Sequence, residues 1–474
     1  MRVGMSSARI SVGLAVALAV LECTGPVELV VAQEAALPQA PTTTAAAFPD
    51  FDGDGTADLV YGVGTTRSYV ALSYGSGRSQ TITRTDAGGT DPASDDNTTG
   101  FGQGLLARNL NGDAYADLVV VDASQGAGSA LYLVFGSADG LRPAAARRYP
   151  VPSGMYGFHG SPALLESPGR LLVVSTGVPG IKGGAVLAYQ LGADGLPTGA
   201  PKLLSQQNLP GTDENGDAFG TSIAASGNLL LIGIPGEDLD SVQRAGAVLV
   251  LKYGGGFKFT GTTITQRTAG VTGKAERWDG FGRSVAIAGG YAAVGVPGED
   301  LGKRDAGAVH VFKVTKGELK HVARVSQDSK WVSGKGETGD MFGYSVAIGR
   351  TCDGYPGLLV GAPHEAIGSI AAAGSAWLIP IERHPGDCPV QLYEGGRLGG
   401  TAREMASVGA AVSMLRSGKV GADTVVLTSP GMSEEGVYGR VITQATPFSG
   451  NAATVAKDLI LNENSTLVLS PPAG

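Results

Sequence analysis

The amino-acid sequence predicts an all-β fold, a seven-bladed β-propeller of four-stranded antiparallel blades. A unit of roughly 60 residues recurs along the chain, which is the pattern of repeat architectures. Each clear copy divides into four short segments, and the best of these alternate with a period of two, as β-strands do. The 75 glycines among 474 residues suit many short strands joined by tight turns.

Three copies of the unit open with the dipeptide Phe-Gly, at Phe219, Phe281 and Phe342, at intervals of 62 and 61 residues. Weaker copies begin at Phe101, near Tyr156 and at Val408, and the first copy lacks the dipeptide. Together they predict seven blades, near residues 47–99, 100–150, 151–205, 206–265, 266–326, 327–395 and 396–470. If the degenerate copy at 156–205 is only an insertion, the count is six, which is the alternative prediction.

The clearest copy has four strand-like segments, residues 281–288, 291–296, 306–314 and 318–325. Gly289-Gly290 joins the first two as a two-residue hairpin turn, in which glycine accepts positive φ without steric cost. A β-helix would have much shorter rungs, and tandem sandwiches need about 100 residues each. Residues 458–462 or 466–470 can complete the last blade, and the sequence does not choose between them.

Composition excludes some classes of function. Charged residues make up 16% of the chain and hydrophobic residues 43%, a balance that supports a large core rather than disorder. The net charge of −8 and the lack of a basic stretch argue against nucleic-acid binding. The acidity is compatible with divalent cations. No stretch beyond the N-terminus has the run of about 20 apolar residues that a membrane span needs.

The N-terminus has the pattern of an export signal. Arg2 and Arg9 precede the apolar run 10–21, and small residues predict cleavage after Ala32, with Ala36 as the alternative. We therefore expect a secreted protein with a signal peptide over 1–32, a flexible segment over 33–46 and the propeller over 47–474.

Two cysteines, Cys352 and Cys388, remain after removal of the signal. In an oxidising compartment an isolated pair predicts a disulfide, and two unrelated thiols are the alternative. A zinc site is not indicated, because neither a C-x-x-C motif nor a spaced histidine partner is present.

An acidic loop precedes the strand-like segment LVYG in the first copy. Asp50, Asp52, Asp54 and Asp58 stand at positions 1, 3, 5 and 9, and the carbonyl of Thr56 stands at position 7. Glycines at positions 4 and 6 let the loop turn sharply, so the oxygen atoms can converge on one point. Oxygen-only ligands in a flexible loop favour Ca²⁺.

A second loop has the same spacing in the next copy. It offers the side chains of Asn109, Asn111, Asp113 and Asp117 and the carbonyl of Tyr115. Two carboxylates have become amides, so the lower ligand charge predicts weaker binding of a second Ca²⁺ ion. Later copies have simple turns or lack the acids. We therefore expect two ions, both in the first two blades.

These features resemble the FG-GAP repeat family, known from the integrin α-subunit head and from secreted bacterial proteins. The resemblance rests on the Phe-Gly openings, on Gly-x-Pro segments at Pro235, Pro297 and Pro363, and on the aspartate-rich loops. The resemblance covers about Phe48 to Gln444, and the sequence of residues 296–312 resembles that of an actinobacterial branch of the family. It implies a propeller with calcium-binding loops, and it informs fold more than function.

Two further acidic positions recur in three successive copies. Two residues before each phenylalanine stand Asp217, Asp279 and Asp340, which we expect to stabilise a turn. Equivalent loop positions hold Glu237, Glu299 and Glu365, which we expect to lie as an acidic arc on one surface and to keep that face soluble.

The chain shows no G-x-S-x-G, H-E-x-x-H or phosphate-loop motif, and its five histidines are scattered. We therefore predict no catalytic residues and no cofactor besides calcium. The expected function is a monomeric extracellular binding or adhesion module with an unknown protein or glycan ligand. The alternative is a secreted hydrolase or lyase acting on a polysaccharide or other polymer at the channel mouth. A third hypothesis is that the protein is a scaffold without a small-molecule ligand.

Overall fold

The computed structural model divides the chain into two units, Met1–Thr44 and Ala45–Gly474, and all residues described below belong to the second. The predicted signal peptide over 1–32 and the segment over 33–46 lie outside the described residues. The described residues are 49–63, 68–90, 100–124, 126–351, 354–382, 390–393, 396–398, 401–415, 423–429, 432–433, 436–437, 440–444 and 454–455.

The strands form antiparallel sheets in which consecutive strands lie side by side. The first sheet contains β1 (Leu59–Val63), β2 (Tyr69–Ser73) and β3 (Ser79–Thr83). The second contains β4 (Phe101–Arg108), β5 (Asp117–Asp122), β6 (Ala130–Val134) and β7 (Arg147–Pro150). The third contains β8 (Gly157–Leu165), β9 (Leu171–Gly177), β10 (Ala185–Gln190) and β11 (Lys202–Leu204).

Two further sheets follow the same order along the chain. One contains β12 (Ile223–Ser226), β13 (Leu229–Ile234), β14 (Ala247–Tyr253) and β15 (Phe259–Ile264). The next contains β16 (Ser284–Ala288), β17 (Tyr291–Val296), β18 (Ala308–Thr315) and β19 (Glu318–Val325).

The remaining sheets lie in the C-terminal part of the chain. One contains β20 (Ser345–Arg350), β21 (Pro356–Ala362), β22 (Ser375–Pro380) and β23 (Val390–Leu392). The last contains β24 (Val412–Leu415), β25 (Thr424–Ser429), β28 (Arg440–Gln444) and β29 (Thr454–Val455). A short hairpin pairs β26 (Met432–Ser433) with β27 (Gly436–Val437). Among the described residues, the helical turns are η2 (Gly126–Gly128) and η3 (Pro143–Ala145).

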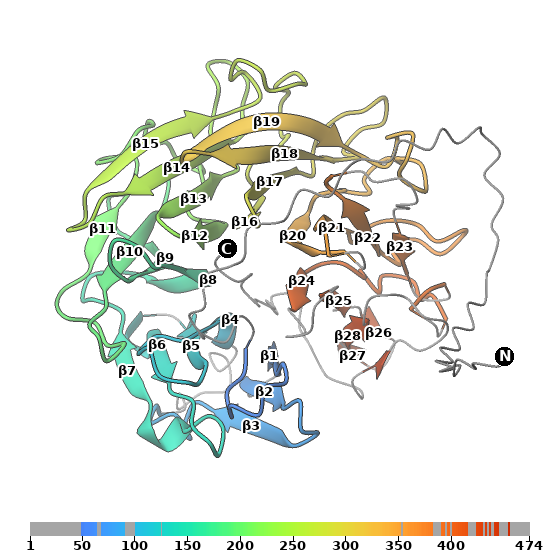
Figure 1. Ribbon diagram of the computed structural model, residues 1–474. Helices are drawn as coiled ribbons and strands as arrows, with labels where there is room; N and C mark the ends of the chain where they lie inside the picture. The colour runs from blue at the N-terminus through green and yellow to red at the C-terminus, as the bar shows by residue number, and fades with distance from the viewer. Residues whose placement is uncertain are drawn as a thin grey trace, which may run out of the picture. The chain divides into compact units, whose positions relative to one another are not determined.

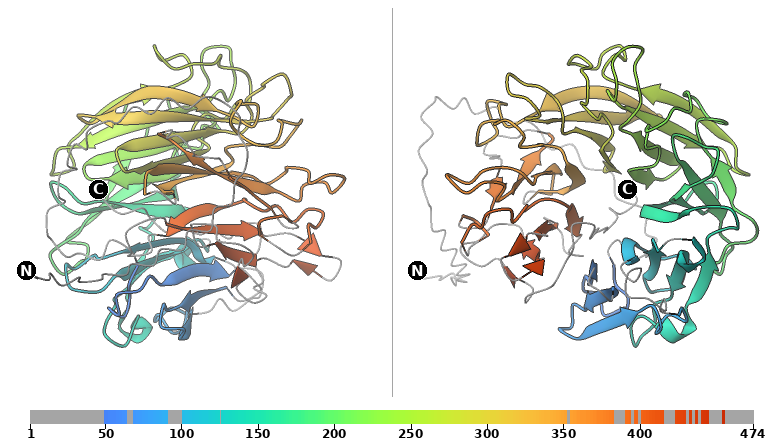
Figure 2. Two further views of the ribbon diagram at one scale, coloured as in Figure 1. Left: turned by 45° about the vertical axis from the view of Figure 1, so that its right-hand side comes forward. Right: turned by 180° about the vertical axis from the view of Figure 1, so that it is seen from behind.

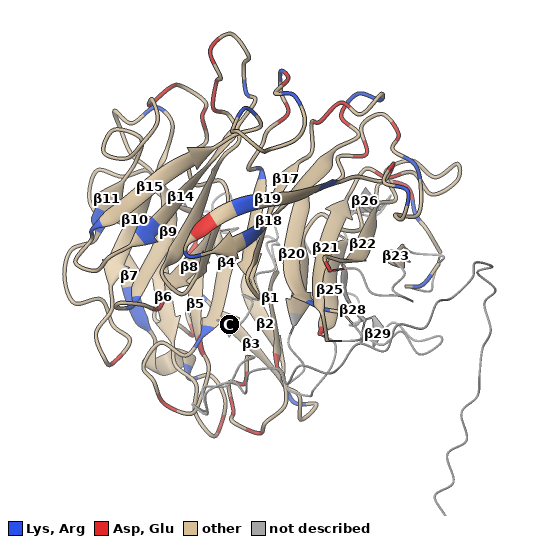
Figure 3. Cartoon of the chain, turned by 45° about the horizontal axis from the view of Figure 1, so that its top comes forward, with Lys and Arg blue, Asp and Glu red and all other residues tan. Residues whose placement is uncertain are grey.

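Within the second unit the sheets follow one another around a common centre, so the all-β propeller is confirmed (Figures 1 and 2). The inner strands form a continuous series of neighbours, β4, β8, β12, β16, β20 and β24. Hydrophobic clusters lie between consecutive sheets, and one of them joins β9 and β10 to β13 and β14. Figure 3 shows the charged residues mainly on the connecting loops and on outer strands such as β19. This arrangement explains why β13 is buried along its whole length.

The described residues form six four-stranded antiparallel blades, which is the number in the alternative prediction. The main prediction of seven four-stranded blades is not met exactly, because the first sheet has three strands. The first sheet has three strands because β1 directly follows the acidic loop, as β5 does, and no strand is described before that loop. The degenerate copy at 156–205 is not an insertion, since it forms the complete β8–β11 blade.

The strands predicted in the clearest copy are confirmed. Ala288 pairs with Tyr291 across Gly289-Gly290, whose φ angles of 56° and 77° fit a two-residue hairpin turn. In the last blade, β29 takes the outer position. The proposed closing strands at 458–462 and 466–470 lie outside the described residues. No helix among the described residues is long and apolar enough to cross a membrane.

Candidate functional site

The first acidic loop runs from Asp50 to Asp58 and leads directly into β1. Asp50, Asp52 and Asp58 each offer a carboxylate oxygen, and these atoms lie within 4.8 Å of one another. Gly53 and Gly55, with φ of 73° and 81°, make the sharp turns that bring the acids together. The structure therefore unites three of the five predicted ligands.

Backbone N–H groups fix the carboxylates of this loop. Asp50 Oδ1 accepts hydrogen bonds from the N–H groups of Gly53 at 2.6 Å and of Asp54 at 3.1 Å. Asp58 is fully buried, and its oxygens accept the N–H groups of Phe51 at 2.7 Å and Gly75 at 2.9 Å. Asp58 thus ties the loop to the end of β2.

The electrostatics of the loop differ between its inner and outer acids. Burial raises the pKa of Asp58 to about 6 and also raises the pKa of Asp50. Asp54 is exposed and hydrogen-bonds to the hydroxyl and the N–H of Thr56, which lowers its pKa. Asp54 therefore stands apart from the three converging carboxylates.

The second loop repeats this framework around Asp117. Asp117 is fully buried and accepts the N–H groups of Leu110 at 2.7 Å and Gly136 at 3.0 Å, as Asp58 does in the first loop. Burial raises its pKa to about 6. The amide group of Asn111 donates to Asp113 Oδ2 at 2.8 Å, so these two side chains partly satisfy each other.

The other predicted ligands of the second loop also bond within it. Asn109 Oδ1 accepts the N–H of Gly112 at 2.6 Å, and Asp113 Oδ1 accepts the N–H of Tyr115 at 2.8 Å. Among the described residues, three acidic side chains converge as a possible metal cluster in the first loop only. In the second loop the side-chain oxygens of Asn109, Asn111 and Asp113 accept backbone N–H groups of the loop itself.

The two loops are joined to each other through the backbone. The N–H of Ala116 donates to the carbonyl of Asp50 at 2.8 Å, and the N–H of Ser137 donates to the carbonyl of Phe51 at 3.1 Å. A change in the first loop is therefore transmitted directly to the β4–β7 blade.

A buried polar site recurs where three blades meet their successors, and the sequence did not reveal it. Each copy pairs a glutamine amide group with a glutamate of the next blade: Gln206 with Glu237, Gln266 with Glu299, and Gln327 with Glu365. The glutamates are 9%, 2% and 6% exposed, so the expected acidic surface arc is wrong. They are buried because each receives a glutamine donor from the preceding blade. The sequence feature that could have revealed these pairs is a Ser-Gln or Thr-Gln dipeptide that recurs once in each of the three copies.

The recurring aspartates stabilise turns, as predicted. Asp217, Asp279 and Asp340 accept the backbone N–H three residues earlier, at 2.7, 2.6 and 2.5 Å. Burial raises the pKa of Asp217 and of Asp279 to about 7. These aspartates are therefore costly to ionise in the folded chain.

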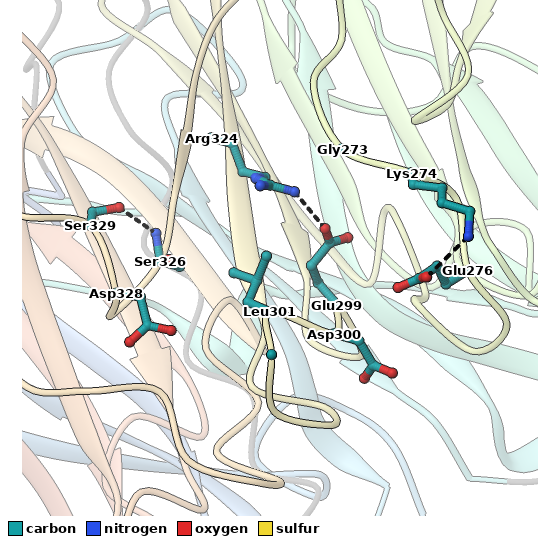
Figure 4. Close-up of a pocket in the computed structure, with 11 residues that line it drawn as sticks. Gly273, Lys274, Glu276, Glu299, Asp300, Leu301, Arg324, Ser326, Asp328 and Ser329 are labelled. Carbon is teal, nitrogen blue, oxygen red and sulfur yellow. Dashed lines mark hydrogen bonds and ion pairs between the residues drawn. The ribbon is translucent and has the colours of Figure 1, made fainter.

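A polar cavity of about 630 Å³ lies beside Glu299. Arg324 Nη1 bonds to Glu299 Oε1 at 2.7 Å within it, and Lys274 Nζ lies 3.6 Å from Glu276 Oε1 (Figure 4). Asp300 also lines the cavity. This mixture of charges can recognise a polar ligand.

His310 is buried in β18 with Nδ1 3.0 Å from His321 Nε2, and burial lowers its pKa to about 3. It is therefore neutral and part of the core. Cys352 and Cys388, the proposed disulfide, lie outside the described residues.

Comparison with known proteins addresses the fold and the repeat. A candidate 6-phosphogluconolactonase from Bacteroides uniformis has a TM-score of 0.50 at 13% identity, with 86% of this chain and 97% of that chain covered. A second from Bacteroides fragilis has a TM-score of 0.48 at 13% identity, covering 86% and 96%. At such identity the first likeness shows the fold alone.

Sequence comparison gives a shorter but more specific match. No curated protein matches the chain. Residues 274–312 match the family model described as FG-GAP repeat, and they span β16, β17 and most of β18. The secreted bacterial branch stays a prediction. The predicted resemblance to FG-GAP repeats is confirmed by these residues, and the chain is a β-propeller that contains an FG-GAP repeat.

Proposed function

We propose that the chain is a calcium-stabilised β-propeller that acts as an extracellular binding module for a protein or glycan. The observation that carries the proposal is the convergence of Asp50, Asp52 and Asp58. Three carboxylates held this close repel one another, and a bound Ca²⁺ ion would relieve that repulsion. The donor set of the loop fits the ion, because it consists of oxygen atoms only.

In this proposal calcium stabilises the fold and the ligand binds elsewhere. The loop is anchored to the next blade through Asp50 and Phe51, so an ion there would order both. The polar cavity beside Glu299 is the proposed ligand surface, because Lys274, Asp300 and Arg324 offer both charges to a polar ligand. Secretion, a monomeric state and a second, weaker ion in the Asn109–Asp117 loop belong to the same proposal.

Thermal unfolding with calcium or with excess chelator tests the first half. We expect a stabilisation of about 3 kcal/mol when calcium reaches one hundred times its dissociation constant. Asp52→Asn should remove most of this gain, whereas Asp139→Asn, at an exposed aspartate outside the loop, should keep it. An equal unfolding temperature in calcium and chelator would contradict the proposal.

A glycan and protein array tests the second half. We expect at least one ligand whose affinity falls tenfold or more in Lys274→Ala and stays unchanged in Lys252→Ala, since both lysines are exposed but only Lys274 lines the cavity. Cleavage of an arrayed polysaccharide would instead support the alternative function, a hydrolase or lyase.

A further inference from the structure

Trp278 lies in the connection between β15 and β16, at a position that recurs in other blades. Its backbone N–H donates to the carbonyl of Gln243, in the connection between the second and third strands of the preceding blade, at 3.0 Å. Gly339 and Met405 make the corresponding bonds in the next two blades, at 2.9 and 3.1 Å. The three residues are therefore equivalent.

The backbone at this position favours glycine. Trp278 has a φ of 73°, and the equivalent Gly339 has a φ of 87°. Gly216, which precedes its repeat phenylalanine by the same three residues, has a φ of 96°. A bulky side chain is strained in this left-handed region, and such strain is typical of functional sites. The fold alone would therefore place glycine where this blade has tryptophan.

The strain at Trp278 is not offset by burial, because its side chain is 50% exposed. Two guanidinium groups lie over its ring instead, with Arg244 Cζ 4.4 Å and Arg277 Cζ 5.7 Å from the ring centroid. Stacking on an indole holds a guanidinium group in place while its N–H groups can still bond to a ligand. Tryptophan and arginine are also the residues that dominate the energetics of binding surfaces.

No carboxylate neutralises these two guanidinium groups. Within the part of the chain that the structure describes, neither of them forms an ion pair. Acids close to them in the sequence pair with other cations: Asp240 with Arg267 at 2.5 Å, and Glu276 with Lys274 at 3.6 Å. The surface around Trp278 therefore offers two positive charges to a ligand.

The same face of the propeller exposes further apolar side chains. Because the strands of each blade are antiparallel, the β7–β8, β15–β16 and β23–β24 connections lie at one end of their blades, as does the cavity beside Glu299. Tyr156 in the first connection is 65% exposed, and Met405 in the third is 55% exposed. With Trp278 they are the three most exposed large hydrophobic side chains among the described residues.

We propose that Trp278, Arg244 and Arg277 bind an anionic polysaccharide. The C–H face of a sugar ring packs on the exposed part of the indole, and a carboxylate or sulfate group accepts hydrogen bonds from the guanidinium groups. This inference rests on the proposed function, an extracellular binding module, and names the class of its ligand. A polysaccharide is favoured over an acidic peptide because its units repeat, as the exposed apolar positions do.

Affinity measurements on the full chain in calcium-containing buffer test the site. The probes are hyaluronan, which carries carboxylates, dextran sulfate, which carries sulfates, and neutral dextran. We expect at least one anionic polymer to bind at least tenfold more tightly than dextran, and the polymer that binds identifies the oxyanion. Added salt should weaken this binding. Equally tight binding of poly-L-glutamate would reveal a general anion site and contradict the proposal.

Trp278→Gly is the most informative variant, because the fold already accepts glycine at Gly216 and Gly339. It should unfold at the same temperature as the wild type or higher, and yet lose at least tenfold in affinity for the anionic polymer. Arg244→Gln should also weaken binding at least tenfold. Arg147→Gln, at an exposed arginine on β7, should bind as the wild type does.

The inference and the proposed function can fail separately. If the wild type binds neither anionic polymer, or if Trp278→Gly and Arg244→Gln bind it as the wild type does, the inference is wrong. The proposed function still stands in either case if another arrayed ligand binds and loses affinity in Lys274→Ala.

Discussion

Glu365 shows how strongly a single buried acid responds to its neighbours. It is 6% exposed, accepts the amide group of Gln327 at 2.6 Å and faces the carboxyl group of Asp340. Burial and the charge of Asp340 raise the pKa of Glu365 to about 8. Its folded form therefore keeps a proton that an unfolded chain would release near pH 4.5.

This pKa gives stability a definite dependence on pH. Because the folded chain binds the proton more tightly, the contribution of Glu365 is present at low pH and is lost as pH rises toward 8, by up to about 1.4 kcal/mol per pH unit. In Glu365→Gln this part of the pH dependence of the free energy of unfolding should vanish, and the variant should be more stable than the wild type at pH 8. Urea unfolding from pH 5 to 8 measures it. The exposed Glu318→Gln is the control, and equal slopes in all three chains would refute the assignment.

At the scale of the element, consecutive blades are held at close range by paired glycines. A Cβ atom on Gly233, Gly295 or Gly361 would lie 2.1, 2.0 or 2.0 Å from the carbonyl oxygen of the repeat glycine in the next blade. These second-strand glycines bring the inner strands together at a distance that no side chain allows.

Gly295→Ala tests this contact. The added methyl group would collide with the Gly343 carbonyl, so we expect a loss of about 3 kcal/mol in the free energy of unfolding. Gly199→Ala is the matched control, since nothing lies within 4 Å of its added Cβ, and it should gain or lose less than about 1 kcal/mol. Denaturant titration gives both values, and similar values for the two variants would show that the contact can relax.

At the scale of the whole molecule, each blade packs mainly against its neighbours in the series. Stability in such a chain is local, and an ion acts first on the blades that it touches. The first acidic loop touches the β4–β7 blade through Asp50 and Phe51 and lies several blades away from β16–β19.

Hydrogen exchange with and without chelator maps this locality. We expect faster exchange on calcium removal within residues 49–63 and 109–122, because the acidic loop and the backbone bonded to it lose their ion. Strands β16–β19 should exchange at the same rate in both conditions. A uniform change around the ring would show that the blades respond as one cooperative body.

The sequence predicted what depends on local pattern. Phe-Gly spacing and period-two segments located the blades, and the Asp50–Asp58 loop was recognisable because its ligands are contiguous. The Gln206–Glu237 pair was missed because its members are 31 residues apart and belong to different blades. The three-stranded first sheet was missed because the count of repeats does not say which strand of a unit comes first among the described residues.

The paired glycines also determine how the protein could associate with other copies if its ring of blades opened. In the contacts of Gly233, Gly295 and Gly361, a second-strand glycine on one flank of a blade meets the repeat glycine on the facing flank of the next blade, so the contact is head-to-tail rather than self-matching. Such contacts yield a closed ring when the rotation completes a circle and an open filament when it does not. A ring split between two blades would expose both kinds of flank at once. Split rings from separate chains could then join end to end, and the same contact that shapes the monomer would drive its polymerisation.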